Sequence, residues 1–206
     1  MRDCCDHHHV ELLAARRRRV LVAVFVINAA MFAGEFGAGL LIGSTALLGD
    51  SLDMLGDALV YGFSLYALGR SARWGNGAAL LKGIEMAGFG LFVLAHAAIQ
   101  VSGEAVPLSA AMAGVAVLAL AANAVCFGLL YRYRAADLNM RSTWLCSRND
   151  LIANAGVLAA AGAVQVTGAA WPDILVGLAI AALFLVTSFG VLRESSAALA
   201  AGQTRR

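Results

Sequence analysis

Long apolar segments separated by short polar stretches make up most of the chain. A helix that crosses the hydrocarbon core of a bilayer needs about 20 mostly apolar residues. Five segments meet this length: 20–42, 45–68, 78–101, 108–131 and 174–192. A sixth run, 151–166, is short by itself but reaches spanning length if its helix begins near Met140. The pattern therefore predicts an all-α membrane protein with six transmembrane helices.

Composition supports this class of protein. The 206 residues are 61% hydrophobic and only 14% charged, and the mean hydropathy is +0.78. An ordinary soluble domain has about 25% charged residues. Because too few charged side chains are present to cover a water-soluble fold, a soluble enzyme, a nucleic-acid binder and a disordered chain are all excluded.

Basic residues fall on one side of the predicted spans. The three loops 43–44, 102–107 and 167–173 hold no Lys or Arg. The other side holds Arg2, Arg16–Arg19, Arg70, Arg73, Arg132, Arg134, Arg141, Arg193, Arg205 and Arg206. Since Lys and Arg in short loops stay in the cytoplasm, both termini are expected inside, in the plasma (inner) membrane if the protein is bacterial. We expect a tail at 1–19, a membrane domain at 20–192 and a short tail at 193–206.

Two carboxyl groups lie near the middle of the second predicted span. Asp53 and Asp57 are four residues apart and therefore share one helix face. Counted from Thr45, they lie about 12–18 Å into the bilayer. A charge there costs about 2.5–3.5 kcal/mol, and two stacked carboxylates repel, so a proton or a cation is expected between them. The structural alternative is a pair of protonated acids that hydrogen-bond neighbouring helices.

The fifth predicted span repeats this spacing. Cys146 and Asp150 are four residues apart, and Asn154 extends the same face. Cys146 and Asp150, together with Asp53 and Asp57, supply four donors, which suits the tetrahedral coordination of zinc. The thiolate of Cys146 favours softer divalent metals. A buried cysteine by itself is more often a small apolar residue. The donors indicate a site for a divalent metal ion, and no prosthetic group is expected.

Further polar residues are candidates for supporting roles. Glu35, Asp50 and Asn154 are expected to lie behind the metal ligands or in a solvated vestibule, and Glu35 shares its helix face with Asn28. The amino-terminal tail carries thiols and imidazoles of the kind that bind metals, although a plain solvated tail is the alternative. Its candidate ligands are Cys4, Cys5, His7, His8 and His9.

Two motifs resemble the cation diffusion facilitator family of divalent-metal transporters. The first is Ser44-Thr45-Ala46-Leu47-Leu48-Gly49-Asp50-Ser51-Leu52-Asp53-Met54-Leu55-Gly56-Asp57. The second is Asn139-Met140-Arg141 leading to Cys146-Ser147-Arg148-Asn149-Asp150, and Trp171-Pro172-Asp173 before the last span also fits. The resemblance implies that Asp53, Asp57 and Asp150 are metal ligands and that Cys146 occupies a position usually held by His.

The resemblance further implies a function. A transporter of this kind would export Zn, Cd or Co from the cytoplasm in exchange for protons, through a site between the second and fifth helices. The carboxy-terminal cytosolic domain of most relatives is not expected here, so a homodimer would be held by its membrane helices. The alternative is a metal-binding accessory protein that does not transport. An enzyme is not expected, because no His-Glu-x-x-His motif and no nucleophile–base pair are present.

Overall fold

A computed structural model describes residues 3–67, 75–103, 106–132 and 138–203, and the side chains of 16, 18–62, 65, 83–103, 106–132 and 147–193. These residues form six helices and, within the described ranges, no strand. The helices are α1 (Asp3–Ile42), α2 (Thr45–Ala67), α3 (Gly75–Ser102), α4 (Ser109–Tyr131), α5 (Leu138–Thr167) and α6 (Trp171–Gln203).

The six predicted helices are confirmed, and most of their ends agree to within a few residues. α5 begins at Leu138, which confirms that its helix starts well before the apolar run. The first and last helices of the chain are longer than their apolar segments, because α1 begins at Asp3 and α6 continues to Gln203. The additional turns are rich in Ala, Leu and Arg, which favour helix even in the absence of an apolar environment.

Five helices contain a segment that is long and apolar enough to cross a membrane: Arg18–Ile42, Gly83–Ser102, Ser109–Tyr131, Ser147–Thr167 and Trp171–Arg193. α2 is not among them, although its 23 residues are about 34 Å long. Every 18-residue window of α2 contains Asp50, Asp53 and Asp57. Three acids therefore distinguish this helix from its neighbours, and the chain is a multi-pass membrane protein whose second helix carries charge into the bundle.

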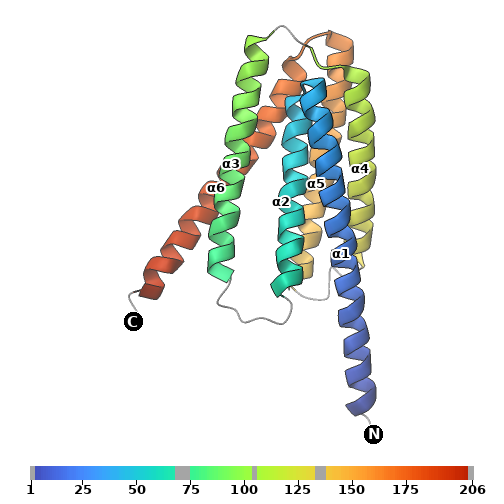
Figure 1. Cartoon of the computed structure of the whole chain (residues 1–206), viewed down its shortest axis with the longest axis vertical. Coiled ribbons are helices and arrows are strands. Elements are labelled where there is room, and N and C mark those ends of the chain that lie inside the picture. Colours follow the sequence, from blue (N-terminus) through green and yellow to red (C-terminus); the bar gives the residue numbers. More distant parts are fainter. Residues whose placement is uncertain (1–2, 68–74, 104–105, 133–137, 204–206) are drawn as a thin grey trace.

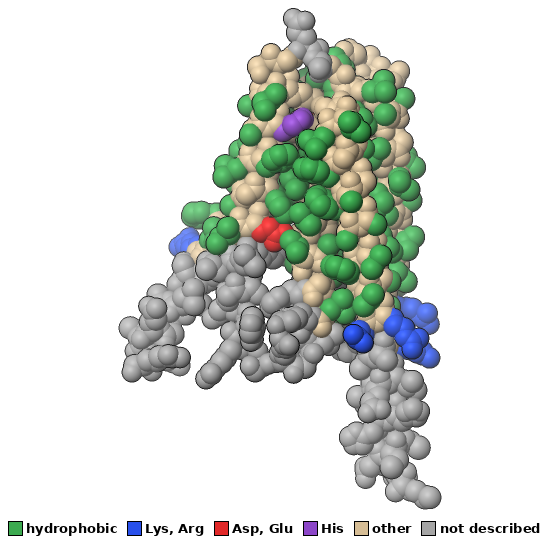
Figure 2. Space-filling model, in the orientation of Figure 1, with side chains coloured by type: hydrophobic (Ala, Val, Ile, Leu, Met, Phe, Trp, Pro, Cys, Tyr) green, Lys and Arg blue, Asp and Glu red, His purple; other side chains and the backbone are tan. Residues whose placement is uncertain are grey.

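Successive helices run in opposite directions, so the first turn of α1 and the last turn of α6 lie at the same end of the bundle (Figure 1). The most extensive contacts join α3 to α6, α1 to α2 and α4 to α5, and α2 also touches α3, α5 and α6. Figure 2 shows apolar side chains along the side of the bundle and basic side chains grouped at the end that holds the termini. We call this the terminal end and the opposite one the distal end.

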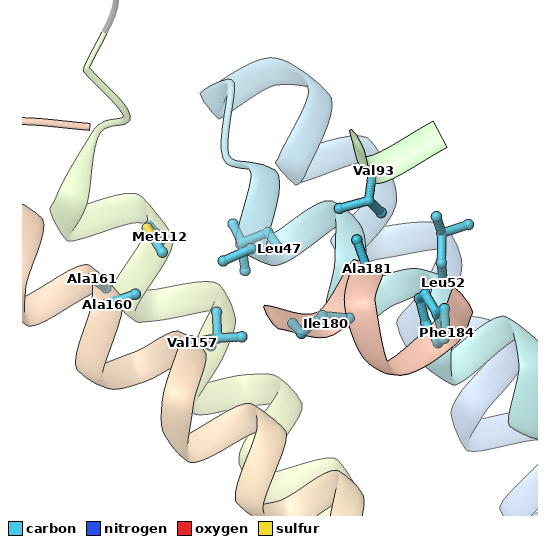
Figure 3. Packing of buried hydrophobic residues seen from close by; sticks show 12 residues of the cluster. Leu47, Leu52, Val93, Met112, Val157, Ala160, Ala161, Ile180, Ala181 and Phe184 are labelled. Carbon is cyan, nitrogen blue, oxygen red and sulfur yellow. The ribbon is translucent and has the colours of Figure 1, made fainter. Parts of the chain in front are cut away.

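Two apolar clusters fill the interior at different levels. The larger one lies toward the distal end and is drawn in Figure 3. It consists of Ala46, Leu47, Leu52, Val93, Met112, Ala116, Val157, Ala160, Ala161, Ile180, Ala181 and Phe184. The smaller one lies toward the terminal end and consists of Leu21, Val24, Tyr61, Cys126 and Leu130.

Polar side chains occupy the level between the two clusters. On α2 and α4 they lie between residues of the two clusters, on α1 they follow residues of the smaller cluster, and on α5 they precede residues of the larger one. They are Asn28 on α1, Asp53 and Asp57 on α2, Asn123 on α4, and Asp150 and Asn154 on α5. This polar layer therefore places the candidate ligands of α2 and α5 at a similar level of the bundle.

A buried carboxylate fixes the distal end of α2. Asp173 of α6 is fully buried and accepts hydrogen bonds from Ser44 Oγ (2.6 Å), Thr45 N (2.8 Å), Ala46 N (3.1 Å) and Gln100 Nε2 (2.9 Å). The first N–H groups of a helix have no partner within the helix, and a negative charge there also interacts favourably with the helix dipole. Asp173 therefore joins α2, α3 and α6 at this end.

Close packing supports the same junction. Thr45 hydrogen-bonds to His96 Nδ1 at 2.8 Å and to the Gln100 side chain, both on α3. A Cβ atom added to Gly177 of α6 would lie 2.9 Å from the carbonyl carbon of Thr45. Only glycine allows this approach, as is common where helices meet in membranes. The tight turn from α1 into α2 uses Gly43, whose φ of 73° favours glycine.

Candidate metal site

The polar faces of α2 and α5 meet in the bundle. Asn154 Nδ2 donates a hydrogen bond to Asp50 Oδ1 at 3.1 Å and a second one to the carbonyl oxygen of Asp150 at 2.9 Å. Both Asp50 and Asn154 are 1% exposed. This contact places the helix face that carries Asp53 and Asp57 next to the face that carries Asp150, as the spacing along the sequence suggested.

Carboxylates of both helices interact electrostatically with a thiol of a third helix. Cys126 of α4 is buried and free, and its thiol interacts with the charges of Asp57 and Asp150. Asp53, Asp57 and Asp150 are themselves partly buried. Asp57 of α2 and Asp150 of α5 therefore both interact with the same residue of α4.

Two neighbouring side chains orient Asp57 and Cys126. Tyr61 is 2% exposed, and its hydroxyl donates a hydrogen bond to Asp57 Oδ2 at 2.7 Å. Asn28 of α1 donates to Cys126 Sγ at 3.7 Å and to the carbonyl oxygen of Val24 at 2.9 Å. A donated hydrogen bond stabilises a charged carboxylate, so Tyr61 holds Asp57 in one orientation at the edge of the polar layer.

Sequence reasoning did not assign Tyr61 or Cys126 to the site. Tyr61 follows Asp57 by four residues, and this spacing places it one turn along the same face, so a pattern search could have found it. Cys126 gave no comparable signal, because it stands in an apolar segment of α4 and its approach to α2 and α5 depends on how three helices pack.

Several predicted ligands have side chains outside the described residues. The side chains of Cys146 and of the tail residues lie outside the described residues; the tail residues are Cys4, Cys5, His7, His8 and His9. Among the side chains that the structure describes, no group of three or more His, Cys, Asp or Glu is arranged to hold a metal ion. The set Asp53, Asp57, Cys146 and Asp150 therefore stays a prediction.

Two further acids are buried deeply. Glu35 of α1 and Asp50 of α2 are each 1% exposed, so Asp50 is not the solvated vestibule residue that its position near the end of the span allowed. Glu35 interacts with Asp50, and Asp50 also interacts with the charge of Asp53. A connected group of acids thus extends from α1 to the polar layer.

Comparison with known proteins matched most of the chain to one family. Residues 21–200 match the cation efflux transmembrane domain. The comparison with curated proteins found no match. The matched range includes α2 and four of the five segments that are long and apolar enough to span a membrane. Of the remaining segment, Arg18–Ile42, it includes all but the first three residues.

Proposed function

The chain belongs to the cation efflux family of metal-cation transporters, and on this basis we propose that it exports a soft divalent metal, Zn, Cd or Co, from the cytoplasm in exchange for protons. The observation that supports the proposal is the hydrogen bond from Asn154 to Asp50, which joins the acidic face of α2 to the face of α5 that carries Asp150. Charged groups inside a membrane are rare and mark ion or proton pathways.

The proposed ligands are Asp53 and Asp57 of α2 and Cys146 and Asp150 of α5. Two of these carboxylates, Asp57 and Asp150, interact with the buried thiol of Cys126, and Asn154 hydrogen-bonds to Asp50 across the two helices. Carboxylates repel one another without a cation, so a divalent ion is expected to draw them closer than they lie in its absence. The thiolate supports a preference for softer metals over magnesium or calcium, which prefer oxygen ligands.

Proton exchange follows from competition for the same groups. A ligand must lose its proton to bind metal, so metal entering from the cytoplasm releases protons, and protons entering from the other side displace the metal. The basic end of the bundle supports an orientation with the termini in the cytoplasm. Two protons for each divalent ion would move no net charge against the membrane potential.

Transport by purified protein in liposomes tests the proposal. Zn, Cd and Co uptake is measured under an imposed pH gradient for the wild type, Asp57→Asn and Asp137→Asn, which removes a carboxylate in the predicted loop before α5. We expect Asp57→Asn to abolish uptake and Asp137→Asn to leave it close to the wild-type rate. Equal uptake by Asp57→Asn and the wild type would refute the site.

Two outcomes separate the finer parts of the proposal. Cys146→His is expected to change the order of preference among the three metals. An unchanged order would show that the Cys146 thiolate does not determine the selectivity. Metal binding by the wild type without uptake in liposomes would instead support the accessory protein, which binds metal for another transporter.

A further inference from the structure

Glu35, Asp50 and Asn154 form a buried group that lies beside the proposed metal ligands and is not required by them. The three side chains come from α1, α2 and α5, and each is 1% exposed. Asn154 Nδ2 donates to Asp50 Oδ1 at 3.1 Å. Three different helices therefore bring polar groups to one place from which water is excluded.

Most oxygens of this group have no hydrogen-bond donor. Both carboxyl oxygens of Glu35, Asp50 Oδ2 and Asn154 Oδ1 are buried without a partner. The carboxyl groups of Glu35 and Asp50 nevertheless interact with one another, and α1 packs extensively against α2. Ionised carboxylates only accept hydrogen bonds, and an unsatisfied buried acceptor costs about 1–3 kcal/mol, more for a charged group. A hydrogen between Glu35 and Asp50 removes one of the two negative charges and joins one oxygen of each carboxyl group.

The surroundings favour a proton over a metal ion at this position. The charged group on α2 that acts on Asp50 is Asp53, which is another acid. From the remaining helices, Cys126 of α4 and Asp150 of α5 interact with one another in the polar layer, and His96 of α3 and Asp173 of α6 belong to the distal junction. Among the described side chains, no cluster of three such residues is arranged for a metal.

We infer that Glu35 binds an exchangeable proton, which it shares with Asp50 as a carboxylic acid–carboxylate pair separate from the metal ligands. Asn154 donates to Asp50 Oδ1, which leaves Asp50 Oδ2 as the oxygen available to this proton. The role of this proton rests on the proposed metal–proton exchange, whereas its presence does not. Glu35 therefore acts as a proton-binding residue of the transporter rather than as a support for the ligands.

Asp53 connects this proton to the metal. Asp50 interacts with the charge of Asp53, one turn farther along α2. A divalent ion bound at Asp53 adds positive charge near the pair and favours its fully ionised form. The O–H bond of Glu35 then breaks and the proton leaves to water. Because such coupling is reciprocal, protonation of Glu35 weakens metal binding and promotes release of the ion on the proton-rich side.

Counting protons during metal binding tests this coupling. Zn is titrated into the full-length protein in detergent and weak buffer, and the protons released for each ion bound are measured. Glu35→Gln keeps the size of the side chain, and its amide can donate to Asp50 Oδ2. We expect this variant to release about one proton fewer per ion than the wild type. The matched control Glu85→Gln, on α3, is expected to match the wild type.

Infrared spectroscopy tests the proton itself without metal. The wild type without metal is expected to show the C=O stretch of a buried carboxylic acid, which shifts when all glutamates carry a ¹³C label and is lost in Glu35→Gln. The labelled wild type needs no substitution, so this result does not depend on whether a variant folds. If the wild type bound no metal, the proposed function would fail while this measurement still decided the inference.

Three results would overturn the inference. The first is equal proton release per ion by Glu35→Gln and the wild type. The second is an infrared spectrum without an acid band that responds to the glutamate label. The third is a dependence of zinc affinity on Na⁺ or K⁺ at constant pH that Glu35→Gln removes, because the pair would then hold a monovalent cation in place of a proton.

Discussion

Replacement of Asp173 by Ala is expected to destabilise the distal end of the bundle strongly. The substitution removes the acceptor for four hydrogen bonds, two of which come from the backbone N–H groups of Thr45 and Ala46. These two donors are fixed by the helix and cannot turn to other acceptors. Each buried donor without a partner costs about 1–3 kcal/mol, so the expected loss of folding free energy is about 2–6 kcal/mol.

Equilibrium unfolding in mixed micelles measures this loss. Asp173→Asn retains an oxygen acceptor and is expected to lose only about 1–3 kcal/mol. Gln165→Ala is the matched control, because Gln165 also hydrogen-bonds across two helices at the distal end, to Ser109, but is exposed. Exposed substitutions usually stay within about 0.5 kcal/mol. If Asp173→Ala were no less stable than Gln165→Ala, the assignment of Asp173 as the residue that joins α2, α3 and α6 would be wrong.

Three further predictions concern contacts inside the bundle. Gly177→Ala places a methyl group against the backbone of Thr45 and is expected to cost about 1–3 kcal/mol; wild-type stability in the same unfolding assay would contradict this. Tyr61→Phe removes the hydrogen bond to Asp57 and is expected to weaken zinc binding, measured by calorimetry, about tenfold; unchanged affinity would show that Tyr61 does not orient the ligand. Cys126, in a variant that lacks the other three cysteines, is expected to react with a water-soluble maleimide only after unfolding, since it is 1% exposed; rapid labelling of the folded protein would show that water reaches the polar layer.

Much of the fold could be predicted because the membrane imposes simple requirements on the sequence. Backbone polar groups must be satisfied inside each spanning segment, so apolar length alone located the helices. The start of α5 needed a further step, because the polar residues 138–150 are helical although they are not apolar. The additional turns of α1 and α6 lie beyond the apolar segments, and hydropathy carries no signal for them.

The polar site was only partly accessible from sequence. Spacing along one helix predicted that Asp53 and Asp57 share a face and that Asp150 and Asn154 share another. Contacts between helices are set by packing in three dimensions, so the approach of Cys126 to Asp57 had no sequence signal. The burial of Glu35 beside Asp50 is of the same kind, because it requires α1 to pack against α2 at one particular level.

The proposed metal site requires that carboxylates of α2 and α5 hold the same metal ion. A double-mutant cycle tests it directly: zinc binding is measured by calorimetry for the wild type, Asp57→Asn, Asp150→Asn and the double variant. If both groups bind one ion, the second substitution adds little to the first, and the coupling energy is about 0.5–3 kcal/mol. Additive losses of binding free energy would show that the two carboxylates act on separate ions.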